Sequence, residues 1–191
     1  MRLTIVGIIF LFTTGLAACT GNNFAELRHG IETRGHYIHG VPFYKQNEDT
    51  CGPAALAGVL AYWGRSDTLD DITAQIYIPK LSGTLPMDME NYARKAGFDT
   101  SSSAGTLDDL KSFLRRDVPV ICLLDLGFGI YRRPHYIIAV GFGDENAVII
   151  EHDGLRANSV MGYDDFDKAW KRGGRWMLVI KPKADETSHE H

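Results

Sequence analysis

The spacing of apolar residues along the chain changes after about residue 116. Before that point apolar positions recur every three or four residues, as on the buried face of a helix. The helices predicted there cover residues 51–63, 69–77, 86–96 and 106–116. Later runs are rich in β-branched and large apolar residues between glycine and aspartate turns, and they predict strands over residues 118–126, 135–143, 147–153 and 176–181. With one more helix predicted over residues 163–171, this order indicates an α+β fold.

The N-terminal residues have the pattern of a targeting segment. A mostly apolar run follows Arg2 and ends in Leu16-Ala17-Ala18-Cys19, which resembles a bacterial lipobox. In such sequences cleavage precedes the cysteine, which then carries acyl chains. We therefore expect lipidation of Cys19, and the alternative is a plain secretory signal with a chance cysteine. Thr20 stands where an Asp would resemble an inner-membrane retention signal, so the expected location is the outer membrane, facing the periplasm.

The expected organisation follows from this signal and from the helix and strand pattern. It comprises a signal peptide over 1–18, the lipidated cysteine and a tether over 19–40, one domain over 41–182, and a tail over 183–191. With 191 residues, 45% of them hydrophobic, the chain is long enough for one well-buried core.

Charge and motifs exclude several classes of function. The net charge of −4 gives no broad attraction to phosphate, so we do not expect a nucleic-acid partner. The sequence has no phosphate-binding loop, no His-Glu-x-x-His and no Cys-x-x-Cys pair. We therefore expect neither a nucleotide nor a metal or other cofactor.

The mature chain would keep two cysteines, Cys51 and Cys122. Export permits a disulfide between them. Cys122, however, lies in the apolar run Val118 to Leu124, where cysteine usually behaves as a small hydrophobic residue. We therefore expect Cys122 in the core and Cys51 free.

Cys51 lies where a helix is predicted to begin, because Pro53 fits only a first helical turn. At such a place backbone N–H groups and the helix dipole favour the thiolate. A thiolate nucleophile also needs an imidazole to hold and return a proton. His135 and His152, both in predicted strands, are the candidates.

The hairpin between the strands at 135–143 and 147–153 bears on that choice. If Gly143 faces Ala147, His135 and Asp153 become diagonal neighbours on one face, and His152 points to the other. The Asp153 carboxylate could then accept a hydrogen bond from His135 and fix its tautomer. A slip of one residue would instead place His152 on the face of His135.

Attack on a carbonyl also needs donors for the oxyanion that forms. The backbone N–H of Cys51 supplies one. Gln46, five residues upstream on the turn that leads into the helix, carries a carboxamide that could supply the other.

Four segments of the chain resemble the bacteriocin-processing, double-glycine cysteine peptidases. They are Val41 to Gln46, Cys51 to Ala57, Pro134 to Gly141, and Phe166 to Trp170 with Trp176 to Val179 after it. The resemblance is closest to stand-alone, secreted relatives of the peptidase domain that precedes some ABC exporters. It implies a papain-like fold, with the cysteine in the N-terminal helical part and the histidine and acid in the C-terminal antiparallel sheet.

By the same resemblance Cys51 is the nucleophile, His135 its base, Asp153 the orienting acid and Gln46 the oxyanion donor. Two features differ from the family pattern. Gly154 follows the acid where Pro is usual, and Gln46 lies one residue closer to the cysteine than it often does.

We therefore expect a cysteine peptidase that hydrolyses peptide bonds in peptide or protein substrates and is held at the membrane by a lipid anchor. One alternative is an amidase or acyltransferase that uses the same Cys-His site. Another is a non-catalytic peptide-binding module, which the retention of Cys51, His135 and Gln46 disfavours.

Overall fold

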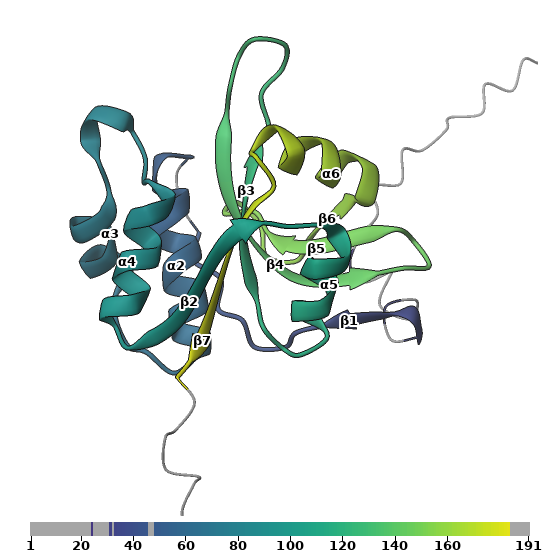
Figure 1. The fold of residues 1–191 in the computed structure, drawn as a ribbon, viewed down its shortest axis with the longest axis horizontal. Coiled ribbons are helices and arrows are strands. Elements are labelled where there is room, and N and C mark those ends of the chain that lie inside the picture. Colours follow the sequence, from purple (N-terminus) through teal and green to yellow (C-terminus); the bar gives the residue numbers. More distant parts are fainter. Residues whose placement is uncertain (1–23, 25–30, 32, 46–47, 184–191) are drawn as a thin grey trace, which may run out of the picture.

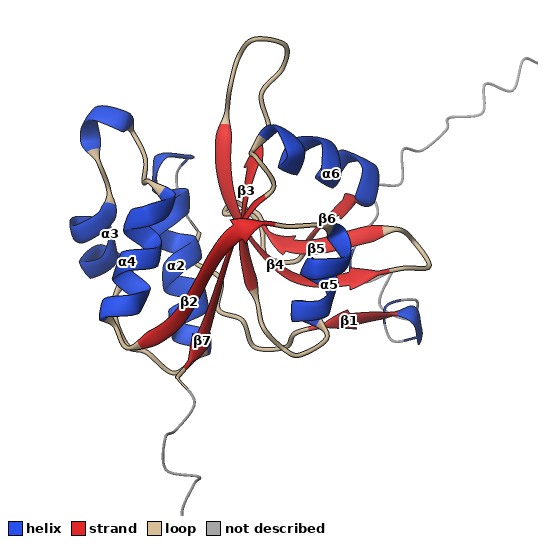
Figure 2. Cartoon of the chain, in the orientation of Figure 1, coloured by secondary structure: helices blue, strands red, loops and turns tan. Residues whose placement is uncertain are grey.

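The computed structural model describes residues 24, 31, 33–45 and 48–183. Cys19 and Gln46, two of the predicted functional residues, lie outside these described residues. The structure within them is an α+β fold, as predicted, with its helices and strands arranged as Figures 1 and 2 show.

The predicted helices are confirmed, with small differences at their ends. They are α2 (Cys51–Tyr62), α3 (Leu69–Ile76), α4 (Pro86–Lys95), α5 (Leu107–Leu114) and α6 (Tyr163–Arg172), with short 3-10 helices at η1 (Glu48–Thr50) and η2 (Pro79–Leu81). Before α5, the Thr106 hydroxyl accepts from the N–H of Asp109 and the Asp109 carboxylate accepts from the N–H of Thr106. This reciprocal pair satisfies two donors that the helix start would leave unpaired, and thereby sets where α5 begins.

The strands form one antiparallel sheet. They are β1 (Gly35–Tyr37), β2 (Phe98–Ala104), β3 (Val120–Asp125), β4 (Pro134–Gly143), β5 (Val148–His152), β6 (Ser159–Gly162) and β7 (Trp176–Pro182). The order across the sheet is β2-β7-β3-β4-β5-β6, and β1 pairs with β4. The strands β1, β2 and β6 were not predicted, because they are short or polar and show no alternation of apolar residues.

The tether predicted over residues 19–40 is too long at its C-terminal end. Residues Gly35, His36 and Tyr37 form β1 and pair with the end of β4, and Ile38 behind them is 1% exposed. Structure in the domain therefore begins before Val41. A three-residue strand is held by its backbone bonds to β4 and leaves little periodicity for a sequence pattern to detect.

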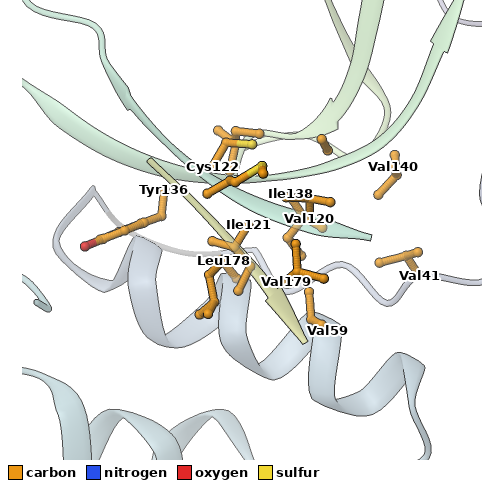
Figure 3. Packing of buried hydrophobic residues seen from close by; sticks show 14 of the residues in the cluster. Val41, Val59, Val120, Ile121, Cys122, Tyr136, Ile138, Val140, Leu178 and Val179 are labelled. Atoms are coloured by element: carbon orange, nitrogen blue, oxygen red, sulfur yellow. The ribbon is translucent and has the colours of Figure 1, made fainter. Parts of the chain in front are cut away.

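The helix α2 packs against the sheet over nearly its whole length. All residues from Cys51 to Leu60 are buried, because the helix is apolar on every side and has other elements around it. Figure 3 shows Ile121, Ile138 and Leu178 on the face of the sheet toward α2. Figure 2 shows α3 and α4 grouped with α2 beside β2 and β7, whereas α5 and α6 lie with the other strands. The start of α2 is thereby brought against the start of β4.

Candidate active site

Cys51 is the first residue of α2 and its side chain is buried, with 6% exposed. The backbone N–H of Tyr136, at the start of β4, points to its sulfur and lowers the pKa of the thiol, as do those of Gly52 and Cys51 itself. Burial nevertheless raises the pKa of the Cys51 thiol, because the thiolate loses more hydration than these donors replace. This shift is opposite in direction to the one expected for a cysteine at a helix start.

Cys122 lies in β3 and is fully buried, and both cysteines are free. Its partner across the ladder is Ile137, so its side chain points to the face away from α2. Burial raises the pKa of the Cys122 thiol well above its ordinary value, and the charge of Glu151 adds to this shift. The predictions that Cys122 belongs to the core and that Cys51 is not in a disulfide are confirmed.

The pairing of β4 with β5 contains an irregularity that decides which side chains share a face. Near the turn Gly143 pairs with Val148, one residue away from the predicted register. A β-bulge between Ala139 and Gly141 then removes this offset, and Ile138 pairs with His152 as predicted. The alternation therefore places His135 and Asp153 on one face and His152 on the other.

The ring of His135 lies next to the backbone of Asp153. Its Nε2 is 2.7 Å from the Asp153 main-chain oxygen. Because a carbonyl oxygen only accepts, Nε2 carries the proton of the neutral ring and Nδ1 keeps the lone pair. His135 directly precedes Tyr136, whose N–H reaches the Cys51 sulfur, so thiol and imidazole belong to one corner of the sheet. In the described part of the chain no hydrogen bond joins them.

The Asp153 carboxylate does not make the contact that was predicted for it. Its Oδ1 accepts from the N–H groups of Leu155 and Arg156, at 2.9 and 2.6 Å, and its Oδ2 lies 3.5 Å from the Arg156 guanidinium. A short side chain that accepts from N–H groups of its own turn in this way caps that turn. Asp153 thus orients His135 through its main chain, whereas its side chain shapes the turn after β5.

His152, the second candidate for the base, has a structural role instead. Its Nε2 lies 3.1 Å from the oxygen of Val41, and its Nδ1 accepts from the N–H of Asn158 at 3.2 Å. Both ring nitrogens are therefore paired in the neutral form. Burial lowers the pKa of His152, since the charged ring would be poorly solvated there.

Sequence reasoning overlooked Glu151, the residue before His152. It is 2% exposed and, together with His135 and Asp153, lines a cavity of about 300 Å³. Burial, and next the charge of Asp153, raise the pKa of Glu151 to about 8. The sequence does contain a signal for this residue, because Glu151 is an acid that directly follows the apolar run Val148 to Ile150.

The loop between β3 and β4 projects from the body of the molecule and leads directly to His135 (Figure 1). Its base is held by Asp125, 2% exposed, whose Oδ1 accepts from the N–H groups of Gly127 and Arg133. Burial opposes ionisation of Asp125, but these donors and the charges of Arg132 and Arg172 lower its pKa. The loop tip exposes Phe128.

Among the described residues, no group of three or more His, Cys, Asp or Glu side chains could hold a metal ion. No described helix is both long and apolar enough to cross a membrane.

Cys51 at the start of α2 and His135 near the start of β4 are thus the cysteine and histidine that this part of the fold offers. Residues 38–177 match the Peptidase_C39 like family. The chain belongs to this family, and it is accordingly a hydrolase of the cysteine peptidase type. A comparison with curated proteins found no match.

Solved structures of peptidase domains share the fold. A C39-like peptidase from Bacillus anthracis superposes with a TM-score of 0.69 at 14% identity, over 80% of this chain and 100% of that one. The double-glycine protease of an AMS/PCAT transporter, in complex with its leader peptide, gives 0.63 at 22% identity, over 79% and 96%. The peptidase domain of Streptococcus ComA gives 0.58 at 23% identity, over 75% and 100%. These similarities confirm the papain-like α+β fold.

Proposed function

We propose that this peptidase hydrolyses peptide bonds with the Cys51 sulfur as nucleophile and the Nδ1 of His135 as base. The observation that carries the proposal is the contact of His135 Nε2 with the Asp153 main-chain oxygen. It holds the ring in the tautomer whose free nitrogen can take a proton. The N–H of Tyr136 meanwhile holds the sulfur beside the same strand end.

The steps follow from these positions. Nδ1 takes the proton of the neutral Cys51 thiol as the sulfur attacks the substrate carbonyl carbon, and the carbonyl oxygen becomes an oxyanion. The N–H of Cys51 and the carboxamide of Gln46 stabilise that oxyanion. Nδ1–H then gives its proton to the departing amine, which leaves an acyl group on sulfur. Water activated by His135 hydrolyses this thioester and restores the thiol.

The substrate that we propose is a peptide or an exposed segment of a protein. Support comes from the structural neighbour that was solved with a leader peptide. The exposed loop between β3 and β4 ends at His135, so a peptide that reaches the sulfur would pass along it.

We also propose that the domain works at a membrane surface through acyl chains on Cys19, in the outer membrane and facing the periplasm. The support is the sequence Leu16-Ala17-Ala18-Cys19 after an apolar run. Residues between Cys19 and the domain would then set how far the active site stands from the lipid.

Mass spectrometry of a peptide-library digest tests the peptidase function. New termini should appear with the wild-type chain and with Cys122→Ala, a matched removal of the other thiol, and should be absent with Cys51→Ala and His135→Ala. An added amine acceptor separates hydrolysis from acyl transfer, because the two products differ in mass. Equal cleavage by wild type and Cys51→Ala would refute the proposal.

A further inference from the structure

The cavity beside His135 extends the active site toward β6. The apolar part of its wall comes from Ile137, Leu155, Val160 and Met161, and charged or polar side chains complete it. Its volume of about 300 Å³ is at the lower end of the range for ligand-binding clefts. That is room for one large side chain. Since His135 lines the same cavity, an occupant would be part of a substrate bound at the reacting centre.

A buried carboxyl group lies beside the apolar part of this wall. Glu151 is 2% exposed, and its Oε2 has no hydrogen-bond partner within the described residues. Buried polar atoms in native proteins nearly always have a hydrogen-bond partner, because leaving one unpaired lowers stability. Glu151 is therefore placed to meet a polar group that enters the cavity.

The state of this carboxyl limits what it can bind. With a pKa of about 8, Glu151 is mostly protonated at neutral pH and can donate a hydrogen bond. The charged or titratable groups around it are Cys122 on β3, Asp153 and Arg156 in the turn after β5, Arg133 in the loop before β4, and His135 in β4.

The charges at the cavity favour a neutral occupant. A cation would meet Arg133 and Arg156 at the walls and a carboxyl group that is largely uncharged. An anion would be attracted by Arg133 and Arg156, but it would also meet the charge of Asp153 and would lose its hydration against the apolar part of the wall. A carboxamide avoids both costs, because its oxygen accepts from the carboxyl and its N–H groups can donate back.

We propose that this cavity is a substrate subsite for a Gln or Asn side chain, whose carboxamide oxygen accepts a hydrogen bond from the Glu151 carboxyl. The proposal rests on the proposed function in one respect, that a peptide is the ligand. It adds a specificity-determining residue, Glu151, on the face of the sheet opposite to α2.

Binding can be measured without turnover. We suggest NMR titration of the full chain carrying Cys51→Ala, with acetylated, amidated Gly-Xaa-Gly peptides in which Xaa is Gln, Glu, Lys or Leu. The Gln peptide should bind most tightly and shift the methyl signals of Ile137, Leu155 and Val160. Tightest binding of the Lys or Glu peptide, or shifts confined to other methyl groups, would overturn the proposal.

The pH dependence gives a second readout. If only the protonated carboxyl binds, the dissociation constant of the Gln peptide should rise about tenfold between pH 7 and pH 9. Glu151→Gln keeps a donor that does not titrate, so its affinity should stay constant over this range. Glu151→Leu should remove the preference for Gln over Leu. An unchanged dissociation constant in the chain that keeps Glu151 would contradict the proposal.

These outcomes are independent of catalysis. If the wild-type chain cleaves no peptide but the Gln preference and its pH dependence are observed, the subsite stands and the catalytic proposal fails. If the wild-type chain cleaves peptides without these binding signatures, the subsite fails alone.

Discussion

The His135 ring donates from Nε2 to the main-chain oxygen of Asp153, 2.7 Å away, while the Asp153 carboxylate accepts from N–H groups of its own turn. The group that fixes the tautomer is therefore backbone. A substitution of the Asp153 side chain that preserves the turn should leave this contact in place. If the carboxylate itself oriented the ring, the same substitution would remove the contact.

Asp153→Asn is the corresponding test. An Asn oxygen can still accept from the N–H groups of Leu155 and Arg156, so we expect kcat to fall by less than about tenfold. Loss of an orienting carboxylate costs roughly 10⁴-fold in the well-studied serine triad. Initial rates on a cleaved peptide measure this, with His135→Ala as the inactive reference. A loss of a thousandfold with unchanged folding would show that the carboxylate itself contacts the ring during turnover.

Alkylation of Cys51 should report a neutral thiol. Because burial raises its pKa, the rate with iodoacetamide should rise with pH to a midpoint above the roughly 8.5 of a free thiol. Cys122 is the internal control and should react only after unfolding, since it is fully buried. Peptide mass mapping over a pH series measures both. A midpoint below 8 would indicate a resting thiolate–imidazolium pair instead.

Much of the fold was predictable because the decisive signals were local. The apolar stripe of α2, the cap formed by Thr106 and Asp109 and the β-branched runs each define an element within a few residues. β2 was missed because its sequence, Phe98 to Ala104, is mostly Ser and Thr. Its backbone pairing with β7 forms this strand, and no pattern within the segment reports that pairing.

The sequence predicted which residues belong to the candidate site but not which contacts they make. Cys51 and His135 follow from a helix start and a strand start. The bulge between Ala139 and Gly141 could not be predicted, and without it the register near the turn would have put His152 on the face of His135. The main-chain role of Asp153 also escaped prediction, because a sequence pattern assigns roles to side chains.

His152→Gln should cost stability rather than catalysis. A Gln carboxamide can replace the Nε2 donor to the Val41 oxygen but lies too far from the backbone to replace Nδ1 as acceptor for the Asn158 N–H, so we expect a loss of about 1–3 kcal/mol in the free energy of unfolding. His39→Gln, at an exposed position, is the matched control and should change little. Urea unfolding measures both variants. An intact stability together with lost peptide cleavage would reverse the roles of His152 and His135.

The same histidine should make stability fall in acid. The pKa of His152 is lowered in the folded chain, so below about pH 6.5 the unfolded chain binds its proton first. The contribution of His152 to the free energy of unfolding should therefore be constant above pH 7. It should decrease as the pH falls from about 6.5, the pKa in the unfolded chain, to the lower pKa in the folded chain. His152→Gln should lack this part of the decrease, and a slope identical to that of the wild type would contradict the assignment.

Cys19→Ser tests the anchor, since the acyl chains are attached through this sulfur. We expect the variant to leave the membrane fraction or to keep its signal peptide, and the wild type to carry acyl mass on its N-terminus. Fractionation and intact-protein mass spectrometry distinguish these results. Wild-type protein in the membrane fraction without acyl mass would remove the lipoprotein proposal and leave the peptidase proposal unaffected.

Gly58→Ala tests how closely α2 must approach the sheet to place Cys51 beside β4. A methyl group at Gly58 would lie 2.7 Å from the Ile138 side chain and 2.8 Å from the Pro42 oxygen. Since the backbone oxygen cannot move away, α2 must shift, and we expect a loss of about 1–3 kcal/mol in the free energy of unfolding. Peptide cleavage should fall too, because the sulfur would be displaced from His135. At Gly83, by contrast, an added methyl group would meet only the Leu81 oxygen, at an ordinary 3.7 Å, so Gly83→Ala should change the free energy of unfolding by less than about 1 kcal/mol. Equal stability of the two variants, measured by urea unfolding, would show that this helix–sheet contact does not position the nucleophile.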